Sequence, residues 1–523
     1  MQPAADIDVL FADIPWDFSF PESSWCLGYR YMIASLRRHG FSARILHPPS
    51  IRDGPVRERM IQQIIGSNAR ILGFTTYDVQ LGLLLEFIKD LRRRGLRSHV
   101  TLGGLCASAA AEALMTGYEA IDSVVFGEGE TSIVELASQI IRGTKPSPIP
   151  GVYRRDGRHV VTGGPRPLVE DLDSLTPPVL DNFADPECHA PLRLTNGCVP
   201  VTASRGCYGR CSFCCVQKFY RSSPGKTWRG RGAAAVAEEI SRVTAATGCR
   251  RITFVDENFM GPGAEGRTHA VEVAREIKRW APAIQFNFGC RANDVDRATM
   301  EELKSAGLAA VTLGIESMSA EALRLFNKGT TPAVNYRALA ILDELELFTE
   351  ITFIFFHPLS TLREVRENLR LIEYVRQSKY LYFNNRQPFS AYIPFFGTDL
   401  AAQFERKALA ERTLYDFRTS YADPRVAFIA QAVLAVPSDA LLNLRSLLPE
   451  GRSPELTRMR EALLGQYVYL NMVRIPELVK RMCDGFDQGE DTSGSGVCAA
   501  AAELQAEARR IETLTARFLA HVA

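Results

Sequence analysis

Arg205-Gly-Cys-Tyr-Gly-Arg-Cys-Ser-Phe-Cys214 is the stretch that decides the fold and the chemistry of this chain. Its three cysteines, Cys207, Cys211 and Cys214, have the spacing C-x3-C-x2-C. Three thiolates on one tight loop can ligate three irons of a [4Fe–4S] cube and leave the fourth iron open to a small molecule. A ferredoxin needs a fourth thiolate in the run, and a zinc site needs a second C-x2-C pair. Neither is present, and chance clustering of buried free cysteines is the remaining alternative.

With Phe213 just before the last cysteine, the motif resembles the signature of the radical S-adenosylmethionine (radical SAM) superfamily. The resemblance implies that the open iron chelates the amino and carboxylate groups of SAM, with Phe213 as a SAM contact. It further implies that reduction of the cluster cleaves SAM to a 5′-deoxyadenosyl radical, which abstracts a hydrogen from the substrate.

The bulk composition is that of an ordinary globular protein. The chain has 523 residues, 46% hydrophobic and 23% charged, which suffices for two or three domains. Its net charge of +1 gives no overall field that would recruit nucleic acid or a membrane. No apolar run approaches the ~18 residues of a membrane span, and the N-terminus lacks the pattern of a signal peptide. The 12 cysteines show no disulfide framework, so we expect a cytoplasmic protein.

The first 145 residues alternate short apolar runs with helical patterns. Strands are predicted over 7–14, 43–46, 71–76, 100–102 and 123–126, and helices over 27–39, 57–67, 80–94, 107–115 and 132–142. This alternation predicts an α/β domain with a doubly wound (Rossmann or flavodoxin-like) parallel sheet. Ligands of such sheets bind beyond the carboxyl ends of the strands.

The predicted strand ends carry residues suited to a ligand: Thr75, Thr76, Tyr77, Gly103, Gly104, Gly127, Glu128, Gly129 and Glu130. Glycine lets backbone amides approach a ligand closely, although glycines also simply terminate strands. The first β–α turn has no G-x-G-x-x-G, and no Lys-Ser/Thr follows the Gly127 run. The sequence therefore argues against a dinucleotide site and against a P-loop.

This domain lies ahead of the cysteine motif. In that position it is similar to the cobalamin-binding domain of the cobalamin-dependent (class B type) radical SAM family. The matching pieces are residues 27–40, the Gly103-Gly104 turn and residues 122–130. The resemblance implies that the strand-end residues contact cobalamin. Two departures leave cobalamin occupancy open. The D-x-H-x-x-G element is absent, and the chain reads Gly103-Gly-Leu-Cys106 where relatives often read Gly-Gly-Pro-His.

Residues 146–196 are rich in Pro and Gly and predict a linker, in which 151–161 forms a hairpin that turns at Asp156-Gly157. A second β/α series occupies residues 197–403. Strands are predicted over 199–203, 252–255, 284–288, 309–313, 351–356 and within 381–393, and helices over 234–246, 270–280, 300–306, 320–326, 334–345 and 362–375. Six strands with crossover helices predict a partial (β/α)6 barrel, whose chemistry lies at the carboxyl ends of the strands.

Polar residues follow most of these strands, and the radical SAM resemblance assigns six of them to SAM: Asp256, Glu257, Asn258, Arg291, Glu316 and Ser317. Asp256 and Glu257 are the candidates for the SAM ammonium, because a desolvated ammonium needs a charge-assisted acceptor. Arg291 is the candidate for the SAM carboxylate. The run Gly314-Ile-Glu-Ser317 matches a sequence of the family. Ordinary ion pairs and caps are the alternative for each residue.

Seven Lys or Arg and no acidic residue lie between Val201 and Gly232. One interpretation is compensating charge for the thiolates, the cluster and anionic cofactor groups. The other is ordinary solvated loop charge. Tyr220 lies in this segment and is the catalytic candidate, as a proton donor or hydrogen-bond anchor, with simple packing as its alternative.

Residues 404–523 show a helical pattern, with helices predicted over 426–436, 439–448, 455–473 and 499–522 and a linker over 485–496. Pro437 and Pro476 lie just past two of the predicted helix ends. The amphipathic stripes favour a packed cap over a recognition surface. No second cysteine-rich cluster domain is evident, which argues against the tRNA-modifying methylthiotransferases that share the core motif.

These observations predict a radical SAM enzyme with the domains 1–145, 146–196, 197–403 and 404–523. Its expected reaction is cobalamin-dependent methylation of an unactivated carbon in a small biosynthetic, natural-product-type substrate. An sp3 carbon is no nucleophile, so polar methyl transfer from SAM fails and a radical route is required. The alternatives are cobalamin-free dehydration or deoxygenation of a sugar or aminoglycoside intermediate, and a non-enzymatic iron–sulfur sensor. The expected cofactors are a [4Fe–4S] cluster, SAM and cobalamin. The expected partners are a small-molecule substrate and an external electron donor of flavodoxin or ferredoxin type, without nucleic acid or membrane.

Overall fold

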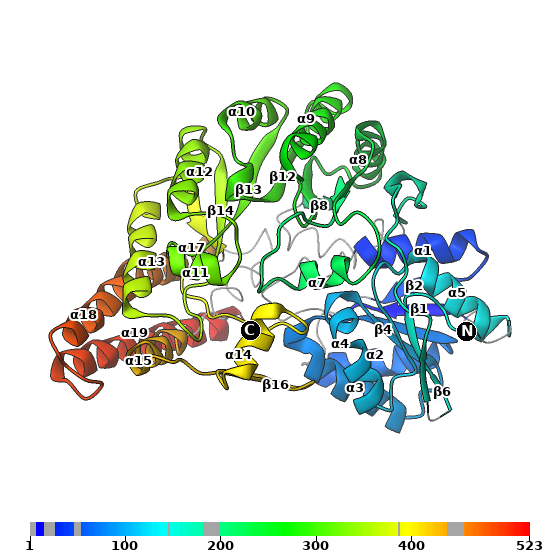
Figure 1. Cartoon of the computed structure of the whole chain (residues 1–523), viewed down its shortest axis with the longest axis horizontal. Helices are drawn as coiled ribbons and strands as arrows, with labels where there is room; N and C mark the ends of the chain where they lie inside the picture. Colours follow the sequence, from blue (N-terminus) through cyan, green and yellow to red (C-terminus); the bar gives the residue numbers. More distant parts are fainter. Residues whose placement is uncertain are drawn as a thin grey trace. The chain divides into compact units, whose positions relative to one another are not determined.

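The computed structural model describes residues 7–14, 27–46, 54–144, 147–157, 159–180, 198–384, 387–436 and 454–522. The chain forms two compact units (Figure 1). The first comprises Met1–Gln285, Pro394–Ala402 and Arg412–Phe417, and the second comprises Phe286–Ile393, Gln403–Glu411 and Arg418–Ala523.

A seven-stranded sheet organises the start of the first unit. Its strands are β1 (Val9–Ala12), β2 (Ala43–Leu46), β3 (Ile71–Thr75), β4 (His99–Gly103), β5 (Ser123–Val125), β6 (Val152–Asp156) and β7 (His159–Thr162). The order is β2-β1-β3-β4-β5-β6-β7, with β1 to β5 parallel and the β6–β7 hairpin added antiparallel to β5. The order 2-1-3-4-5 is that of flavodoxin-like folds, whose ligands bind where the strand order reverses, between β1 and β3.

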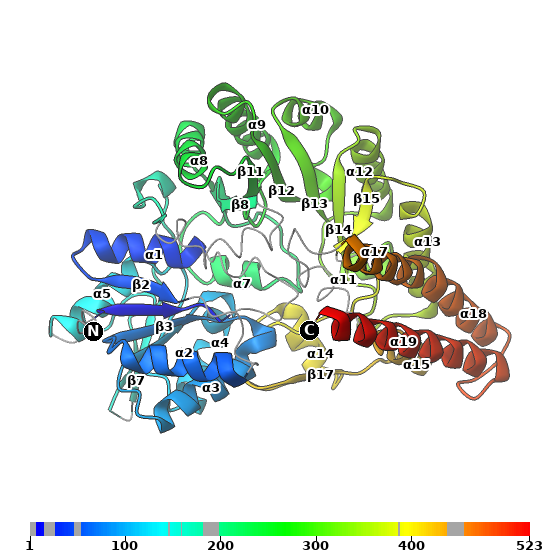
Figure 2. The same cartoon turned by 180° about the vertical axis from the view of Figure 1, so that it is seen from behind.

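Helices cover both faces of this sheet, as Figure 2 shows from behind. They are α1 (Leu27–Arg38), α2 (Gly54–Gly66), α3 (Leu81–Arg93), α4 (Gly104–Gly117) and α5 (Glu130–Ile141). Side chains from α2, α3 and α4 form one apolar core against the sheet, and those from α1 and α5 form a second core on its other face. Because each strand alternates its side chains between these two cores, the parallel strands are buried on both sides.

The rest of the first unit begins the second β/α series. Its elements are β8 (Cys198–Val201), β9 (Ser204–Arg205), α7 (Cys215–Arg221), β10 (Arg229–Gly230), α8 (Ala233–Thr247), β11 (Arg251–Phe254) and α9 (Gly263–Trp280). β8 pairs with β11 in parallel, and β9 pairs with β10 antiparallel. The cysteine motif therefore lies between β9 and α7.

The second unit continues the series and ends in helices. It holds β12 (Gln285–Arg291), α10 (Arg297–Ser305), β13 (Leu308–Glu316), α11 (Ala320–Leu325), α12 (Pro332–Glu344), β14 (Phe348–Phe353), α13 (Leu362–Val375), β15 (Leu381–Phe383), α15 (Pro424–Leu434), α17 (Pro454–Tyr469), α18 (Ile475–Asp487) and α19 (Ser495–Val522). Strands β12, β13, β14 and β15 pair in parallel in that order. Where the chain passes between the units it forms α14 (Asp399–Arg406), β16 (Ala410–Arg412) and β17 (Phe417–Thr419).

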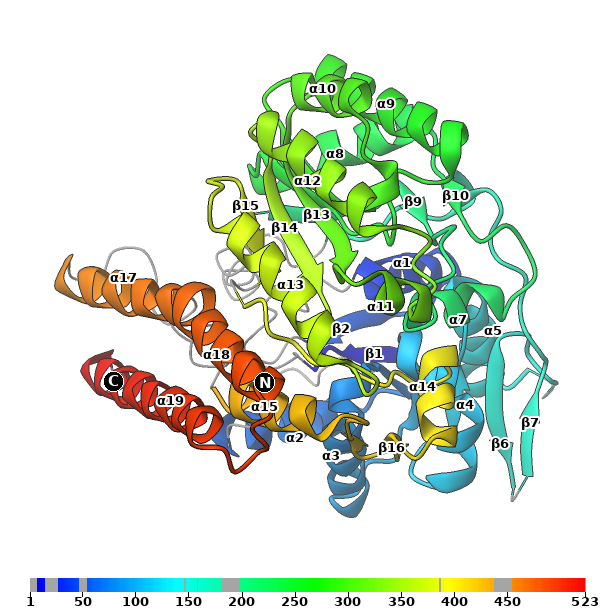
Figure 3. The same ribbon diagram turned by 60° about the vertical axis from the view of Figure 1, so that its left-hand side comes forward.

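Both β/α series and the 151–161 hairpin predicted from the sequence are confirmed, with ends shifted by a few residues. The helix end predicted at Val473 is wrong, because a π-turn over Leu470–Arg474 leads directly into α18, where Pro476 occupies a first-turn position that needs no amide donor. The predicted 485–496 linker shortens to the turn between α18 and α19, which lie antiparallel in Figure 3. The helix predicted over 439–448 lies outside the described residues. Every helix in the described part of the chain is too short or too polar to span a bilayer.

Candidate functional site

A cavity of about 610 Å³ lies within the first unit, at the carboxyl ends of the parallel strands β1, β3, β4 and β5. One part of its lining comes from α1, α5 and the loops that follow these strands. The other part comes from β8, β9, α7 and the end of β11, including Ser204, Arg205, Tyr220 and Glu257. The cavity therefore joins the doubly wound sheet to the segment that carries the cysteine motif.

The cavity penetrates between the sheet and the helices α1 and α5. Phe11, Gly73 and Thr101 lie side by side in the strand register and line its wall. A Cβ atom on Gly73 would lie 2.6 Å from the Phe11 ring, so glycine leaves the room that this ring occupies. The Thr101 side chain is 3% exposed, and its hydroxyl has no hydrogen-bond partner among the described residues. A buried hydroxyl of this kind is costly unless a ligand or water satisfies it.

Eight of the nine residues predicted to contact cobalamin line this cavity: Thr75, Tyr77, Gly103, Gly104, Gly127, Glu128, Gly129 and Glu130. The ninth, Thr76, is buried outside the lining, where its Oγ1 donates to the Gly103 carbonyl at 2.9 Å and accepts from the Ala107 amide at 2.6 Å. Thr76 therefore fixes the turn between β4 and α4. Gly104 has φ +92°, and a Cβ there would lie 2.6 Å from Thr75 Oγ1.

The two residues that depart from the family pattern have different surroundings. Leu105 lines the cavity, whereas Cys106 is fully buried and lies outside the lining. Burial raises the pKa of the Cys106 thiol, and the nearby Asp78 carboxylate raises it further. No histidine lines the cavity among the described residues. Leu105 adds an apolar side chain to the lining, and Cys106 occupies the position of the family's histidine.

The three motif cysteines lie on the loop between β9 and α7. Cys211 is buried, and Cys207 and Cys214 are half-buried. The Gly209 amide donates to Cys207 Sγ at 3.3 Å, and the Cys214 amide donates to the Cys211 carbonyl at 3.2 Å. Burial raises the pKa of the Cys214 thiol, and the neighbouring Cys215, Cys211 and Cys207 raise it further.

No group of three potential ligands in the described residues converges on a single metal ion. In a [4Fe–4S] cluster each cysteine would ligate a different iron. The donor set of three thiols on one loop, with an amide donor to one sulfur, fits such a cluster.

Asp256 and Glu257, predicted to bind the SAM ammonium, both bond to the chain that leads into the cysteine loop. Asp256 is 6% exposed and accepts from the Ala203 amide at 3.1 Å and the Ser204 hydroxyl at 2.5 Å. Burial raises the pKa of Asp256 to about 7, although the Ser204 hydrogen bond opposes this shift. Glu257 is exposed toward the cavity and accepts the Gly206 amide at 2.8 Å. Asn258 is buried and accepts the Gly261 amide at 3.0 Å.

Tyr220, the catalytic candidate, donates its hydroxyl to Glu257 Oε1 at 2.8 Å. It is 5% exposed, and burial together with the Glu257 charge raises its pKa well above the ordinary value. The Arg229 guanidinium carbon lies 5.5 Å from the centre of its ring. The phenol thus stays protonated as a hydrogen-bond donor that holds the Glu257 carboxylate.

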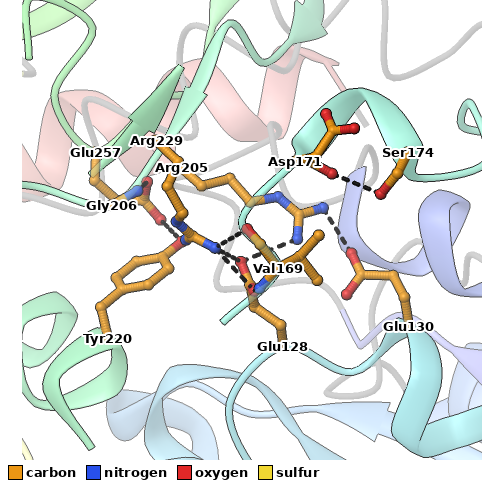
Figure 4. Close-up of polar contacts among 10 residues, drawn as sticks. All are labelled: Glu128, Glu130, Val169, Asp171, Ser174, Arg205, Gly206, Tyr220, Arg229 and Glu257. Atoms are coloured by element: carbon orange, nitrogen blue, oxygen red, sulfur yellow. Dashed lines mark hydrogen bonds and ion pairs between the residues drawn. The ribbon is translucent and has the colours of Figure 1, made fainter. Parts of the chain in front are cut away.

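A buried group of four charges lies beside this pair (Figure 4). Arg205 contacts Glu130 at 2.6 Å and Glu128 at 3.3 Å, and Arg229 contacts Glu128 at 3.0 Å. Of the seven basic residues between Val201 and Gly232, these two therefore neutralise carboxylates of the doubly wound domain. The sequence offered no signal for this pairing, since the partners are 75 to 101 residues apart.

The remaining SAM candidates, Arg291, Glu316 and Ser317, belong to the second unit. Arg291 ends β12, and its guanidinium donates to the Lys328 carbonyl. Glu316 ends β13 with φ +63°, a strained value for a non-glycine residue, and contacts Lys328 Nζ at 3.1 Å. Ser317 is fully buried, with its Oγ 3.2 Å from Asn368 Oδ1.

Comparison with known proteins identifies two domains. Residues 26–137 match the B12 binding domain, and residues 201–372 match the Radical SAM superfamily. An uncharacterized methyltransferase of Pyrococcus horikoshii is 29% identical over 274 residues, which are 52% of this chain and 57% of that protein. The anaerobic magnesium-protoporphyrin IX monomethyl ester cyclase of Cereibacter sphaeroides is 30% identical over 262 residues, which are 48% of this chain and 41% of that protein. This chain spans about half the length of these curated relatives.

Among solved structures, the cobalamin-dependent S-adenosylmethionine radical enzyme OxsB, with aqua-cobalamin and S-adenosylmethionine bound, has a TM-score of 0.73 and 17% identity. The match covers 99% of this chain and 80% of OxsB. The predicted fold class is therefore confirmed, and so are the two cofactor-binding domains. The cofactors that such domains bind are cobalamin, and a [4Fe–4S] cluster with SAM.

Proposed function

We propose that this chain, which belongs to the radical SAM superfamily and carries a B12-binding domain ahead of its radical SAM domain, methylates an unactivated carbon of a small molecule in a cobalamin-dependent reaction. The observation that carries the proposal is the shared cavity. Its lining combines the strand ends of the B12-binding domain with Ser204, Arg205, Tyr220 and Glu257 from beside the cysteine loop. A cofactor in this cavity would thus lie next to the cluster-binding segment.

When bound, the cluster with SAM supplies a hydrogen-abstracting radical and cobalamin supplies a transferable methyl group. The residues of the chain hold these groups in place. Cys207, Cys211 and Cys214 would ligate the cluster, and the wall formed by Phe11, Gly73 and Thr101 would receive part of the cobalamin. The apolar lining excludes water, which protects a reactive carbon from side reactions.

The assignment of SAM contacts remains part of this proposal. Asp256 and Glu257 already bond to the backbone next to the cysteines, so we propose that they support the loop. Glu257 faces the cavity and keeps further acceptor capacity for an ammonium, because a carboxylate has about four lone-pair positions. Phe213, Asn258, Arg291, Glu316 and Ser317 remain candidates from the family resemblance.

An external one-electron donor is required to reduce the cluster, and radical SAM enzymes take such reductants. We propose a flavodoxin or ferredoxin in this role, with the reducing cytoplasm as the location. The substrate is a small molecule of unassigned identity.

The test is anaerobic reconstitution with iron, sulfide and hydroxocobalamin, followed by metal analysis and incubation with SAM and a low-potential reductant. We expect about four irons and one cobalt per chain, the occupancy of one cluster and one cobalamin, together with release of 5′-deoxyadenosine. The variant Cys211→Ala is the control and should release none. A full cluster without cobalt would overturn the methyl-transfer proposal.

The B12-binding match and the cavity count against the cobalamin-free dehydration or deoxygenation that the Leu105-Cys106 departure suggested. Methyl transfer itself is separated from other radical outcomes by SAM labelled in its methyl group. The label should enter the product that accumulates with substrate extracts, and a product without label would exclude methylation.

A further inference from the structure

We propose that Glu128 and Glu130 are the counter-charges that hold the base of the cysteine loop, so that the B12-binding domain assembles the cluster site. This inference rests on the proposed function only in that Cys207, Cys211 and Cys214 ligate a cluster. It assigns the two glutamates a positioning role in place of the cobalamin contact that the family resemblance implied.

The argument begins with the pairing of β9 and β10, which places Arg205 directly opposite Arg229. Like charges directly opposite each other destabilise an antiparallel pair. The Arg205 side chain is 14% exposed and the Arg229 side chain is 3% exposed, so solvent offers little screening. This two-residue pair therefore needs anions from elsewhere in the chain.

Glu128 and Glu130 supply these anions from the loop and first turn that follow β5. Glu130 Oε1 contacts Arg205 at 2.6 Å, and Glu128 Oε1 contacts Arg205 at 3.3 Å and Arg229 at 3.0 Å. Burial alone would raise the pKa of Glu130, but attraction to Arg205 outweighs it and lowers the pKa. Four buried groups thus carry two positive and two negative charges.

The segment between β7 and β8, which connects the two domains, also bonds to this group of four charges. The Val169 amide donates to Glu128 Oε2 at 2.7 Å, and the Val169 carbonyl accepts from Arg229 Nη1 at 2.7 Å (Figure 4). One residue before it, the Leu168 amide donates to the Pro224 carbonyl at 2.8 Å. Both carboxylate oxygens of Glu128 are therefore engaged by protein donors.

The charge group continues directly into the cysteine loop. Arg205 is followed by Gly206, whose amide bonds to Glu257, and by Cys207. Tyr220 holds the other oxygen of Glu257, and Arg229 lies over the Tyr220 ring. A shift of Arg205 therefore displaces the backbone next to the first cluster ligand.

The experiment is a double-mutant cycle in the full-length chain with Glu130→Gln, Arg205→Met and the double variant. The readouts are iron and sulfide per chain after anaerobic reconstitution, and hydroxocobalamin affinity by absorption titration of the cluster-free protein. Each single variant leaves the group of four with one uncompensated charge, which is more damaging than removing one positive and one negative charge together. We expect each single variant to lose at least about half of the bound iron, and the double variant to recover most of it.

The matched control is Glu58→Gln, which removes the exposed Glu58–Arg94 pair of the same domain and should leave cluster content unchanged. Arg205→Lys is the second variant in case Arg205→Met fails to fold. It keeps the charge but not the planar fork that contacts both glutamates, so its cluster content should fall between wild type and Arg205→Met. Far-UV circular dichroism confirms folding in each case.

Two results would overturn the proposal. The first is a Glu130→Gln variant that keeps its full cluster content but binds cobalamin at least about tenfold more weakly, which corresponds to the loss of one hydrogen-bonded contact. This result would make Glu130 a cobalamin ligand. A double variant as deficient as the sum of the single ones would exclude the pairing. None of these readouts uses substrate turnover, so failure of methyl transfer would leave this test intact.

Discussion

The Thr101 hydroxyl lies in the wall of the cavity without a hydrogen-bond partner among the described residues. An unsatisfied buried hydroxyl costs about 1–3 kcal/mol, which the ligand-free chain bears. Thr101→Val, which keeps the shape, should therefore raise the melting temperature of the cofactor-free chain. The same variant should weaken hydroxocobalamin binding about tenfold, because the ligand loses one hydrogen bond.

Thr101→Ser keeps the hydroxyl and is the control for these two measurements, thermal melting and absorption titration. Thr101→Val with unchanged affinity would mean that the ligand does not reach this hydroxyl. A lowered melting temperature would mean that a water already satisfies it.

Asp256 gives the structure a defined pH dependence. Its pKa is about 7 in the folded chain and about 3.9 when unfolded. Between these values the folded chain binds the additional proton, so stability falls as pH rises through this window and is greatest below pH ~4 as far as Asp256 is concerned. Asp256→Asn cannot titrate. We expect the melting temperature of wild type to fall more steeply from pH 5 to pH 8 than that of Asp256→Asn, and parallel slopes would refute the shifted pKa.

At the scale of elements, the close approach of the backbone at Gly206 to Thr227 controls the conformation with which the chain enters the cysteine loop. Gly206 has φ +85°, and a Cβ there would lie 1.7 Å from the carbonyl oxygen of Thr227, in the segment that leads into β10. Gly206→Ala should therefore separate β9 from β10 and abolish cluster incorporation, measured as iron per chain.

Gly95 is the matched control, since it has φ +95° but nothing within 4 Å of its added Cβ. Gly95→Ala should lower the free energy of unfolding by only ~1–2 kcal/mol, the cost of a left-handed non-glycine residue, and the variant chain should keep its full iron content. Equal loss of iron in both variants would show that backbone conformation, rather than the collision, is what matters.

The length of each element, and whether its contacts are local, decide how well the sequence predicts it. The main strands and most helices follow from apolar periodicity, and the spacing of the three cysteines alone predicts a cluster site there. The pair β9–β10 has two residues per strand and α7 has seven, too short for any periodicity to appear. The ion pairs of Glu128 and Glu130 leave no local signal in the sequence, because their arginine partners lie 75 to 101 residues away. The antiparallel docking of the β6–β7 hairpin on β5 likewise depends on tertiary contacts.

At the scale of the molecule, the cavity lining links the B12-binding domain to the residues on both sides of the cysteine loop. Ligand binding at residues of both segments should therefore order both. In hydrogen exchange of the cluster-free chain, hydroxocobalamin should slow exchange at residues 127–130 and also at 204–214. In Glu130→Gln, protection should remain in the B12-binding domain and be lost from the cysteine loop. Equal protection in both proteins would contradict transmission through the charge group.

The distance along the sequence between the paired charges also sets the order in which they are made during synthesis. Glu128 precedes Arg229 by 101 residues, which takes about 5–20 s to translate. The doubly wound domain thus has time to fold before the arginines leave the ribosome, because domains generally fold as units from the N-terminus. The glutamates are then already in place when the cysteine segment emerges. Iron–sulfur delivery would meet a nascent chain whose receiving loop can close as soon as it is made.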